Sequence, residues 1–187
     1  RELSIECHKN NLVVSVDNPV PEDFTSHYDR KEQGLVVDYV IIMGYDEHYV
    51  GSDAGSVASL PWVEQGVQDT IAEVTPERTI LAIPFYTRLW KTTGGAVTSE
   101  AIGMDEAQNV LSTNGVEVAW DGSVGQNYAT FEQDNSTYQI WLEDAQSIAE
   151  KVKLIQKYNL AGVAQWKLGF ENSSIWQTIS DNLQAAS

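Results

Sequence analysis

The stretch VVDYVIIMGYDEHY, residues 36–49, passes from apolar, mostly β-branched residues directly into aromatic and acidic ones. Its first part, Val36–Met43, is apolar at nearly every position, which favours a strand buried on both faces over a strand with one exposed face. Three other runs share this composition and are bounded by polar or turn-forming residues: Leu12–Val16, Ile80–Phe85 and Ala161–Trp166. Together the four runs predict a parallel sheet.

Helices are predicted between and around these strands, because apolar residues recur there at helical spacing. The expected helices are Glu2–Lys9, Pro21–Gln33, Leu60–Val74, Ser147–Tyr158 and Ser174–Gln184. Strands that alternate with helices indicate an α/β fold in which right-handed crossovers join parallel strands.

The segment Lys91–Leu142 departs from this alternation. After a predicted helix over Met104–Leu111, apolar and polar residues alternate in three short runs that are separated by turn signals such as Asp121-Gly122. These runs are Val116–Trp120, Tyr128–Gln133 and Thr137–Leu142. The pattern predicts a small antiparallel α+β insertion between the third and fourth parallel strands.

The composition weighs against several classes of function. The 187 residues include 27 acidic and 11 basic side chains, and the resulting net charge of −16 repels nucleic acid and anionic membrane surfaces. No apolar run is long enough to predict membrane insertion. Cys7 is the only cysteine, so neither an internal disulfide nor a cysteine-based zinc site is expected, and the three histidines lack metal-ligand spacing.

Three of the four predicted strands end in aromatic residues that are followed at once by charged ones. These ends are Met43–Tyr49, Pro84–Trp90 and Gln165–Glu171. In parallel α/β architectures, functional residues collect where the strands end and the loops begin. Aromatic rings that stack on sugars, beside carboxylates and an arginine that bind hydroxyl groups, are typical of a carbohydrate cleft.

These strand ends resemble those of a known enzyme family. The Met-x-Tyr-Asp pattern of Met43–Asp46 resembles the sixth-strand motif of family 18 glycoside hydrolases, which include chitinases and spore-cortex N-acetylglucosaminidases. Pro84–Arg88 is similar to the seventh strand of that family, and Gly162–Trp166 is similar to the eighth. The acidic stretch that precedes the last barrel helix in the family is resembled by Glu143, Asp144, Ser147 and Lys151.

The resemblance covers essentially the whole chain and implies a partial (β/α)₈ TIM barrel. Residues 1–90 would hold barrel strands five to seven, residues 91–142 the insertion between strands seven and eight, and residues 143–187 the last barrel helices with strand eight. A half barrel leaves apolar faces and two strand edges uncovered, which favours a homodimer that closes an eight-stranded ring; the alternative is a monomer whose terminal helices fold over the uncovered face. By resemblance, the location would be extracellular or in the cell envelope.

The resemblance also implies a mechanism, substrate-assisted hydrolysis with retention of configuration, that needs no cofactor. A glutamic acid protonates the glycosidic oxygen, and the 2-acetamido group of an N-acetylglucosamine-containing oligosaccharide attacks the anomeric carbon. Tyr45 would hold the acetamido group, and Asp46 would help to orient it and would support the acid. The substrate-binding residues would be Met43, Tyr86, Arg88 and Trp166.

The general acid of the family belongs to an Asp-x-x-Asp-x-Asp-x-Glu motif that this sequence lacks, since no two of its twelve aspartates are separated by a single residue. Arg1 begins just downstream of where that motif belongs. We therefore expect the C-terminal portion of a hydrolase of chitin or peptidoglycan, inactive on its own. Glu171 stands near a position where chitinases more often carry aspartate, which leaves the substrate open.

Two alternatives remain at this point: a chitinase-like protein that binds carbohydrate without cleaving it, and an unrelated α/β domain that matches the motifs by chance. Structural roles also remain open for single residues. Trp166 could belong to the core, Arg88 could form an ion pair with a nearby carboxylate, and Asp17-Asn18 could either line the cleft or form a turn.

Overall fold

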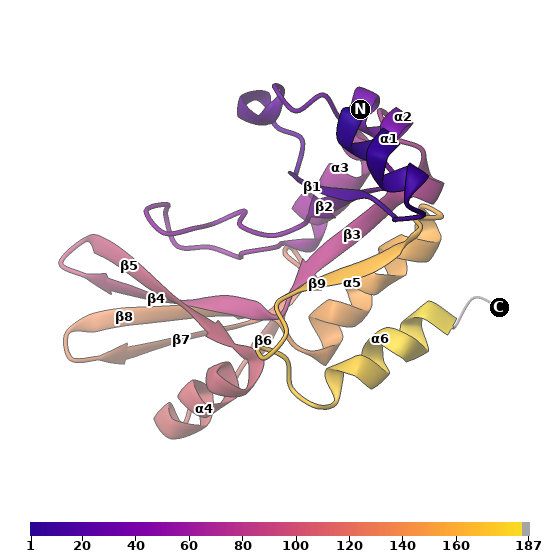
Figure 1. Ribbon diagram of the computed structural model, residues 1–187. Helices are drawn as coiled ribbons and strands as arrows, with labels where there is room; N and C mark the ends of the chain where they lie inside the picture. Colours follow the sequence, from indigo (N-terminus) through magenta and orange to yellow (C-terminus); the bar gives the residue numbers. More distant parts are fainter. Residues whose placement is uncertain (185–187) are drawn as a thin grey trace.

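Two sheets organise the chain in the computed structural model, which describes residues 1–184 (Figure 1). The first is parallel and has the order β1-β2-β3-β9. Its strands are β1 (Ser15–Pro19), β2 (Tyr39–Met43), β3 (Thr79–Pro84) and β9 (Gly162–Trp166). The second is antiparallel, has the order β5-β4-β8-β7-β6, and consists of β4 (Tyr86–Thr93), β5 (Ala96–Gly103), β6 (Ala119–Asp121), β7 (Gln126–Gln133) and β8 (Ser136–Leu142).

Six helices accompany the two sheets in the described part of the chain. They are α1 (Glu2–Lys9), α2 (Arg30–Val36), α3 (Leu60–Ile71), α4 (Met104–Asn114), α5 (Ala145–Lys157) and α6 (Ile175–Gln184), with short 3₁₀ turns at Asp23–Thr25 and Pro76–Arg78. The predicted α/β fold is confirmed. None of the described helices has the length and apolar character needed to cross a membrane.

The main core lies on one face of the parallel sheet. Leu81 and Ile83 of β3 point into it, and α3, α5 and α6 cover them with fully or almost fully buried aliphatic side chains such as Val67, Ile148 and Ile179. Figure 1 shows α5 and α6 side by side below β3 and β9. Burial of this kind gives about 25 cal/mol per Å² of apolar surface, so this face supplies most of the stabilisation.

The opposite face of the parallel sheet is less covered. Burial alternates along β1 and β2, and in β9 no residue is fully buried. The prediction of strands buried on both faces therefore holds for β3 but is wrong for β1, β2 and β9. The physical reason is that the helices among residues 1–184 pack on one face only.

The second sheet begins earlier than predicted. The boundary expected at Lys91 falls inside β4, which starts at Tyr86 and pairs with β5. Gly94 and Gly95, at φ +56 and +87, form the two-residue turn, a conformation that glycine adopts without steric cost. Helix α4 covers one face of this sheet through a small apolar cluster: Ile102, Ala107, Leu111, Ala129, Ile140 and Leu142.

Other element boundaries also differ. The predicted helix Pro21–Gln33 is wrong, because a 3₁₀ turn occupies Asp23–Thr25 and α2 begins only at Arg30, where Asp29 accepts a hydrogen bond from the Glu32 amide as N-cap. The first strand starts at Ser15, three residues later than expected. Residues 185–187, the end of the predicted segment 143–187, lie outside the described residues.

Candidate active site

The carboxyl ends of β2, β3 and β9 meet at one edge of the parallel sheet. Met43 lies beside Ala82, and Pro84 lies beside Trp166. Two backbone hydrogen bonds continue this alignment beyond the strands, from the Gly44 amide to the Ala82 carbonyl at 2.8 Å and from the Phe85 amide to the Trp166 carbonyl at 2.7 Å. The three strand ends that the sequence singled out are therefore neighbours in space.

A cluster of two phenols and one carboxylate forms the centre of this edge. The Tyr86 hydroxyl donates a hydrogen bond to Asp46 Oδ1, and the rings of Tyr45 and Tyr86 meet edge to face with centroids 6.2 Å apart. Asp46 has φ +68, a left-handed conformation that is uncommon outside glycine. The backbone thus holds the Asp46 carboxylate against Tyr86 in a defined orientation.

Both phenols are held in their protonated form. Burial raises the pKa of Tyr45 to about 12, and the negative charges of Asp17 and Asp46 add to the effect. The pKa of Tyr86 is also raised, first by burial and then by the hydrogen bond that it donates to Asp46. Each hydroxyl therefore remains a hydrogen-bond donor throughout the physiological pH range.

Two hollows flank Asp46, and each of the six predicted site residues lines at least one of them. The first encloses about 240 Å³ and is lined by Pro19, Val20, Glu22, Phe24, Met43, Tyr45, Asp46, Tyr49 and Trp62. The second encloses about 180 Å³ and is lined by Asp46, Tyr86, Arg88, Ala101, Trp166 and Phe170. Asp46 lies between an aromatic hollow and a hollow that contains a guanidinium group.

The structure decides two of the alternatives left open by the sequence. Trp166 is 54% exposed, so it does not belong to the core that the described residues form. Arg88 donates from Nη1 to Ser99 Oγ at 3.2 Å, and its buried Nε has no hydrogen-bond partner among the described residues. In that part of the chain Arg88 also forms no ion pair with a carboxylate.

Sequence reasoning did not identify three aromatic residues of the first hollow, namely Phe24, Tyr49 and Trp62. Trp62 donates from Nε1 to Glu22 at 3.1 Å, which fixes its ring at the wall. Tyr49 is the last residue of the strand-end stretch Met43–Tyr49 and could have been predicted from its place there. Phe24 lies in the 3₁₀ turn that follows β1, and Trp62 lies in α3, so neither belongs to the three strand-end stretches and only the fold brings them to the site.

Among residues 1–184, no group of three histidine, cysteine or carboxylate side chains is arranged to hold a metal ion.

Comparison with known proteins identifies the family. The model of glycosyl hydrolases family 18 matches residues 1–171. The chain belongs to family 18 of the glycosyl hydrolases.

Relatives of this family 18 chain include two proteins of Bacillus subtilis. One, named uncharacterized glycosylase YvbX, is 27% identical over 159 residues, which are 84% of this chain and 46% of that protein. The other, named cortical fragment-lytic enzyme, is 26% identical over 157 residues, which are 82% of this chain and 36% of that protein. The chain thus spans less than half the length of these curated relatives.

Solved structures share the fold of this family 18 chain. A chitinase from Chromobacterium violaceum superposes with a TM-score of 0.90 at 25% identity, over 98% of this chain and 59% of that one. The spore cortex-lytic enzyme SleL from Bacillus megaterium gives a TM-score of 0.87 at 22% identity, over 98% of this chain and 44% of that one. The family resemblance inferred from the three strand-end motifs is confirmed, while the numbering of the strands as five to eight stays a prediction.

Proposed function

We propose that this chain forms the part of a family 18 glycoside hydrolase that binds and orients the N-acetyl group of an N-acetylglucosamine-containing glycan, chitin or peptidoglycan. The observation that carries the proposal is the cluster of Tyr45, Asp46 and Tyr86 beside the exposed ring of Trp166. Relatives named as chitinase and as cortical fragment-lytic enzyme support both substrate classes.

Each group in the cluster has a role in substrate-assisted, retaining hydrolysis. The exposed Trp166 ring would carry the apolar face of the sugar, and the neutral Tyr45 hydroxyl would hydrogen-bond to the acetamido group as it attacks the anomeric carbon. The Asp46 carboxylate, oriented by Tyr86, would stabilise the positive charge that develops on the acetamido nitrogen. Met43 and Arg88 would line the cleft on either side.

Protonation of the glycosidic oxygen requires a general acid, and residues 1–187 lack the family motif that supplies it. A positioned general acid contributes on the order of 10² to 10⁴ in rate. We therefore propose that barrel strands five to eight are present here, and that this chain alone does not hydrolyse chito-oligosaccharides. Turnover of a fluorogenic chitobioside by the purified chain, above a control without protein, would contradict this part of the proposal.

Binding tests the site itself. Calorimetric titration should show that a chito-oligosaccharide binds more tightly than a cello-oligosaccharide of the same length, because only the former carries the acetamido group that Tyr45 and Asp46 would hold. Trp166→Ala should weaken both ligands, since stacking on the ring does not depend on the acetamido group. Equal affinity for the two oligosaccharides in the wild-type chain would count against the assigned roles of Tyr45 and Asp46.

A second candidate function is carbohydrate binding without cleavage, because the exposed Trp166 beside the hollows that Tyr45 and Asp46 line suits a bound glycan whether or not an acid is present. The parent gene discriminates between the two. A glutamate in an Asp-x-x-Asp-x-Asp-x-Glu motif upstream of Arg1 supports the enzyme, and a glutamine or leucine at that glutamate position supports the binding protein.

A further inference from the structure

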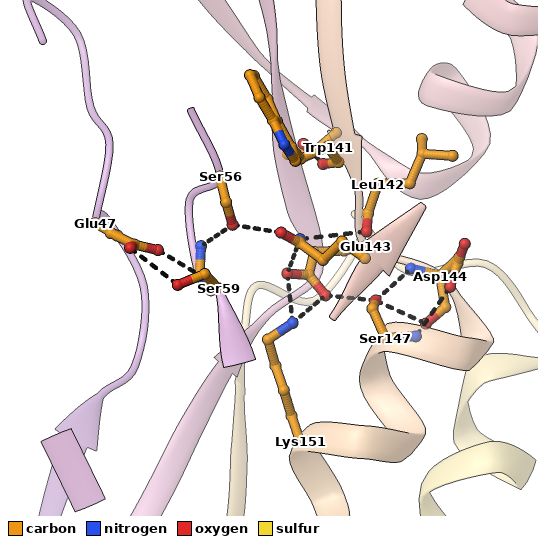
Figure 2. Close-up of polar contacts among 12 residues, drawn as sticks. Glu47, Ser56, Ser59, Trp141, Leu142, Glu143, Asp144, Ser147 and Lys151 are labelled. Carbon is orange, nitrogen blue, oxygen red and sulfur yellow. Dashed lines mark hydrogen bonds and ion pairs between the residues drawn. The ribbon is translucent and has the colours of Figure 1, made fainter. Parts of the chain in front are cut away.

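A fully buried ion pair lies away from the two hollows, where β8 leads into α5 (Figure 2). Both side chains, Glu143 and Lys151, have no exposed surface, and Lys151 Nζ donates to the two carboxylate oxygens at 2.9 and 3.1 Å. Ser147 Oγ donates to Glu143 Oε2 at 2.8 Å, and Gln126 Nε2 donates to Oε1 at 2.8 Å. Both oxygens of the buried carboxylate are therefore satisfied.

Stability alone does not explain this pair. The cost of removing two charges from water roughly offsets their attraction, and apolar residues of similar volume are often equally stabilising. The best-attested use of a buried polar pair is to fix one arrangement of the segments that contact it. The segments joined to Glu143 therefore indicate what the pair fixes.

One of these segments is the loop that carries the candidate site. Ser56, in the loop between β2 and α3, donates a hydrogen bond to Gln126 Oε1, and Ser56 Oγ accepts one from the Ala58 amide at 3.0 Å. Both Ser56 and Gln126 are buried. Figure 2 shows the contacts running from Lys151 through Glu143 towards Ser56. We call Ser56, Gln126, Glu143, Ser147 and Lys151 the Glu143 network.

The loop transmits the position of Ser56 to the residues next to Asp46. The amides of Glu47 and His48 donate to the carbonyls of Val57 and Ser56 at 3.0 and 3.2 Å. The Glu47 carboxylate in turn accepts from the Ser59 amide at 2.7 Å and from the Ser59 hydroxyl at 2.9 Å, at the start of α3 (Figure 2). Hydrogen bonds thus join the two residues that follow Asp46 to the segment from Ser56 to Ser59.

We infer that the Glu143 network is a positioning device for Asp46. It fixes Ser56, Ser56 fixes the paired segment at Glu47 and His48, and that segment holds Asp46 in its left-handed conformation against Tyr86. None of the network residues lines either hollow, so their effect on a bound glycan is indirect. The consequence for glycan binding rests on the proposed function, whereas the effect on the loop does not.

The test is amide hydrogen exchange measured by NMR on the whole chain. Ser56→Ala should speed exchange at Glu47 and His48 by on the order of ten-fold relative to the amides of β3, because the loop opens without global unfolding. Ser56→Thr, which keeps the hydroxyl, should restore the slow exchange. The double variant Glu143→Leu with Lys151→Met, which replaces the charges by apolar groups, should act in the same direction as Ser56→Ala.

The matched control is Glu64→Gln, which removes a carboxylate that links α3 to α5 outside the network. It should leave the relative exchange at Glu47 and His48 unchanged. An unchanged ratio in Ser56→Ala would overturn the inference, and so would an equal acceleration at every amide, which is the signature of a purely structural loss.

Binding of a chito-oligosaccharide is the second readout. It should weaken in Ser56→Ala and recover in Ser56→Thr, and wild-type-like affinity in Ser56→Ala would contradict the positioning role. If the wild-type chain binds no oligosaccharide, the proposed function fails, while the exchange measurement still decides whether the Glu143 network positions the loop.

Discussion

The two faces of the parallel sheet differ in how completely they are packed. Leu81 and Ile83 are fully buried against α3, α5 and α6, whereas Ile41 and Met43 on the other face are half-buried and lead to the exposed ring of Trp166. Because side chains alternate along a strand, one strand serves both faces. The residues that stabilise the fold and the residues proposed to contact a glycan therefore lie on opposite faces of the sheet, so each set can be perturbed on its own.

The largest expected effect concerns what covers the less packed face of the parallel sheet, the face of Ile41 and Met43, which we call the open face. β1 and β9 are the edges of the parallel sheet, and unpaired edges promote association. We expect a two-fold dimer in which β1 of each chain pairs with β9 of the other, closing an eight-stranded ring. Covering about 400 Å² of apolar surface would contribute on the order of 10 kcal/mol. Size-exclusion chromatography with light scattering should give twice the 20.7 kDa mass of the chain.

A monomer mass of 20.7 kDa at high micromolar concentration would remove the dimer from consideration. The open face would then stay exposed to solvent in a stable monomer. The double variant Ser15→Lys with Gly162→Lys is a control for edge pairing. Charges on the two edge strands should shift a dimer towards monomer without disturbing the packed face.

The next effect compares the two faces by substitution. Leu81→Ala removes a fully buried side chain and should lower the free energy of unfolding by about 2–5 kcal/mol. Ile41→Ala, in the adjacent strand but on the open face, should cost less than half as much because water already reaches the side chain. Urea denaturation of both variants measures the difference, and equal losses would mean that the open face is covered in solution.

How far the sequence predicts this molecule depends on the range of the interactions. The β-branched runs and Gly94-Gly95 act locally, so parallel strands could be predicted, and the β4–β5 hairpin could have been predicted had the glycine pair been weighed as a turn. The candidate site residues Tyr45, Asp46 and Arg88 come soon after the ends of predicted parallel strands. Because the ends of parallel strands meet at one edge of the sheet, these residues could be predicted to lie near one another. Their proposed roles rest on the family resemblance.

Contacts between distant segments were not predictable in this way. Trp62 lies on α3, whose apolar spacing predicts a helix but not the direction in which Trp62 points. The orientation of Trp62 towards the site depends on the fold. The link between Ser56 and Gln126 spans 70 residues of sequence. Neither residue carries a local signal of burial, so the Glu143 network becomes visible only when the two sheets and α5 are assembled.

A smaller effect is expected when the Tyr45 hydroxyl is removed from the candidate site. In an active enzyme that contains this chain, Tyr45→Phe should lower kcat by about 10- to 100-fold and change KM little, because a hydrogen bond to a developing charge is worth roughly 1.5–3 kcal/mol in the transition state. Tyr158→Phe is the matched control, since that hydroxyl bonds to Glu64 and Gln68 on the packed side. A wild-type kcat in Tyr45→Phe would exclude the assigned role.

The smallest effect is the titration of the same phenol. Tyr45 is partly buried against the main core, and this burial together with the charges of Asp17 and Asp46 raises its pKa to about 12, against about 10 for a free tyrosine. Between these pH values the unfolded chain loses the proton and the folded chain keeps it. The contribution of Tyr45 to stability is therefore complete below pH 10 and is lost as the pH rises through 12. The phenolate absorbance that Tyr45→Phe removes should appear near pH 12, with circular dichroism confirming that the chain remains folded.

If the absorbance appears near pH 10 instead, water reaches the Tyr45 hydroxyl freely, and the candidate site is as open to solvent as the less packed face of the sheet. If it appears near pH 12, the hydroxyl is shielded from water, and under the proposed function Tyr45 meets the glycan as a hydrogen-bond donor.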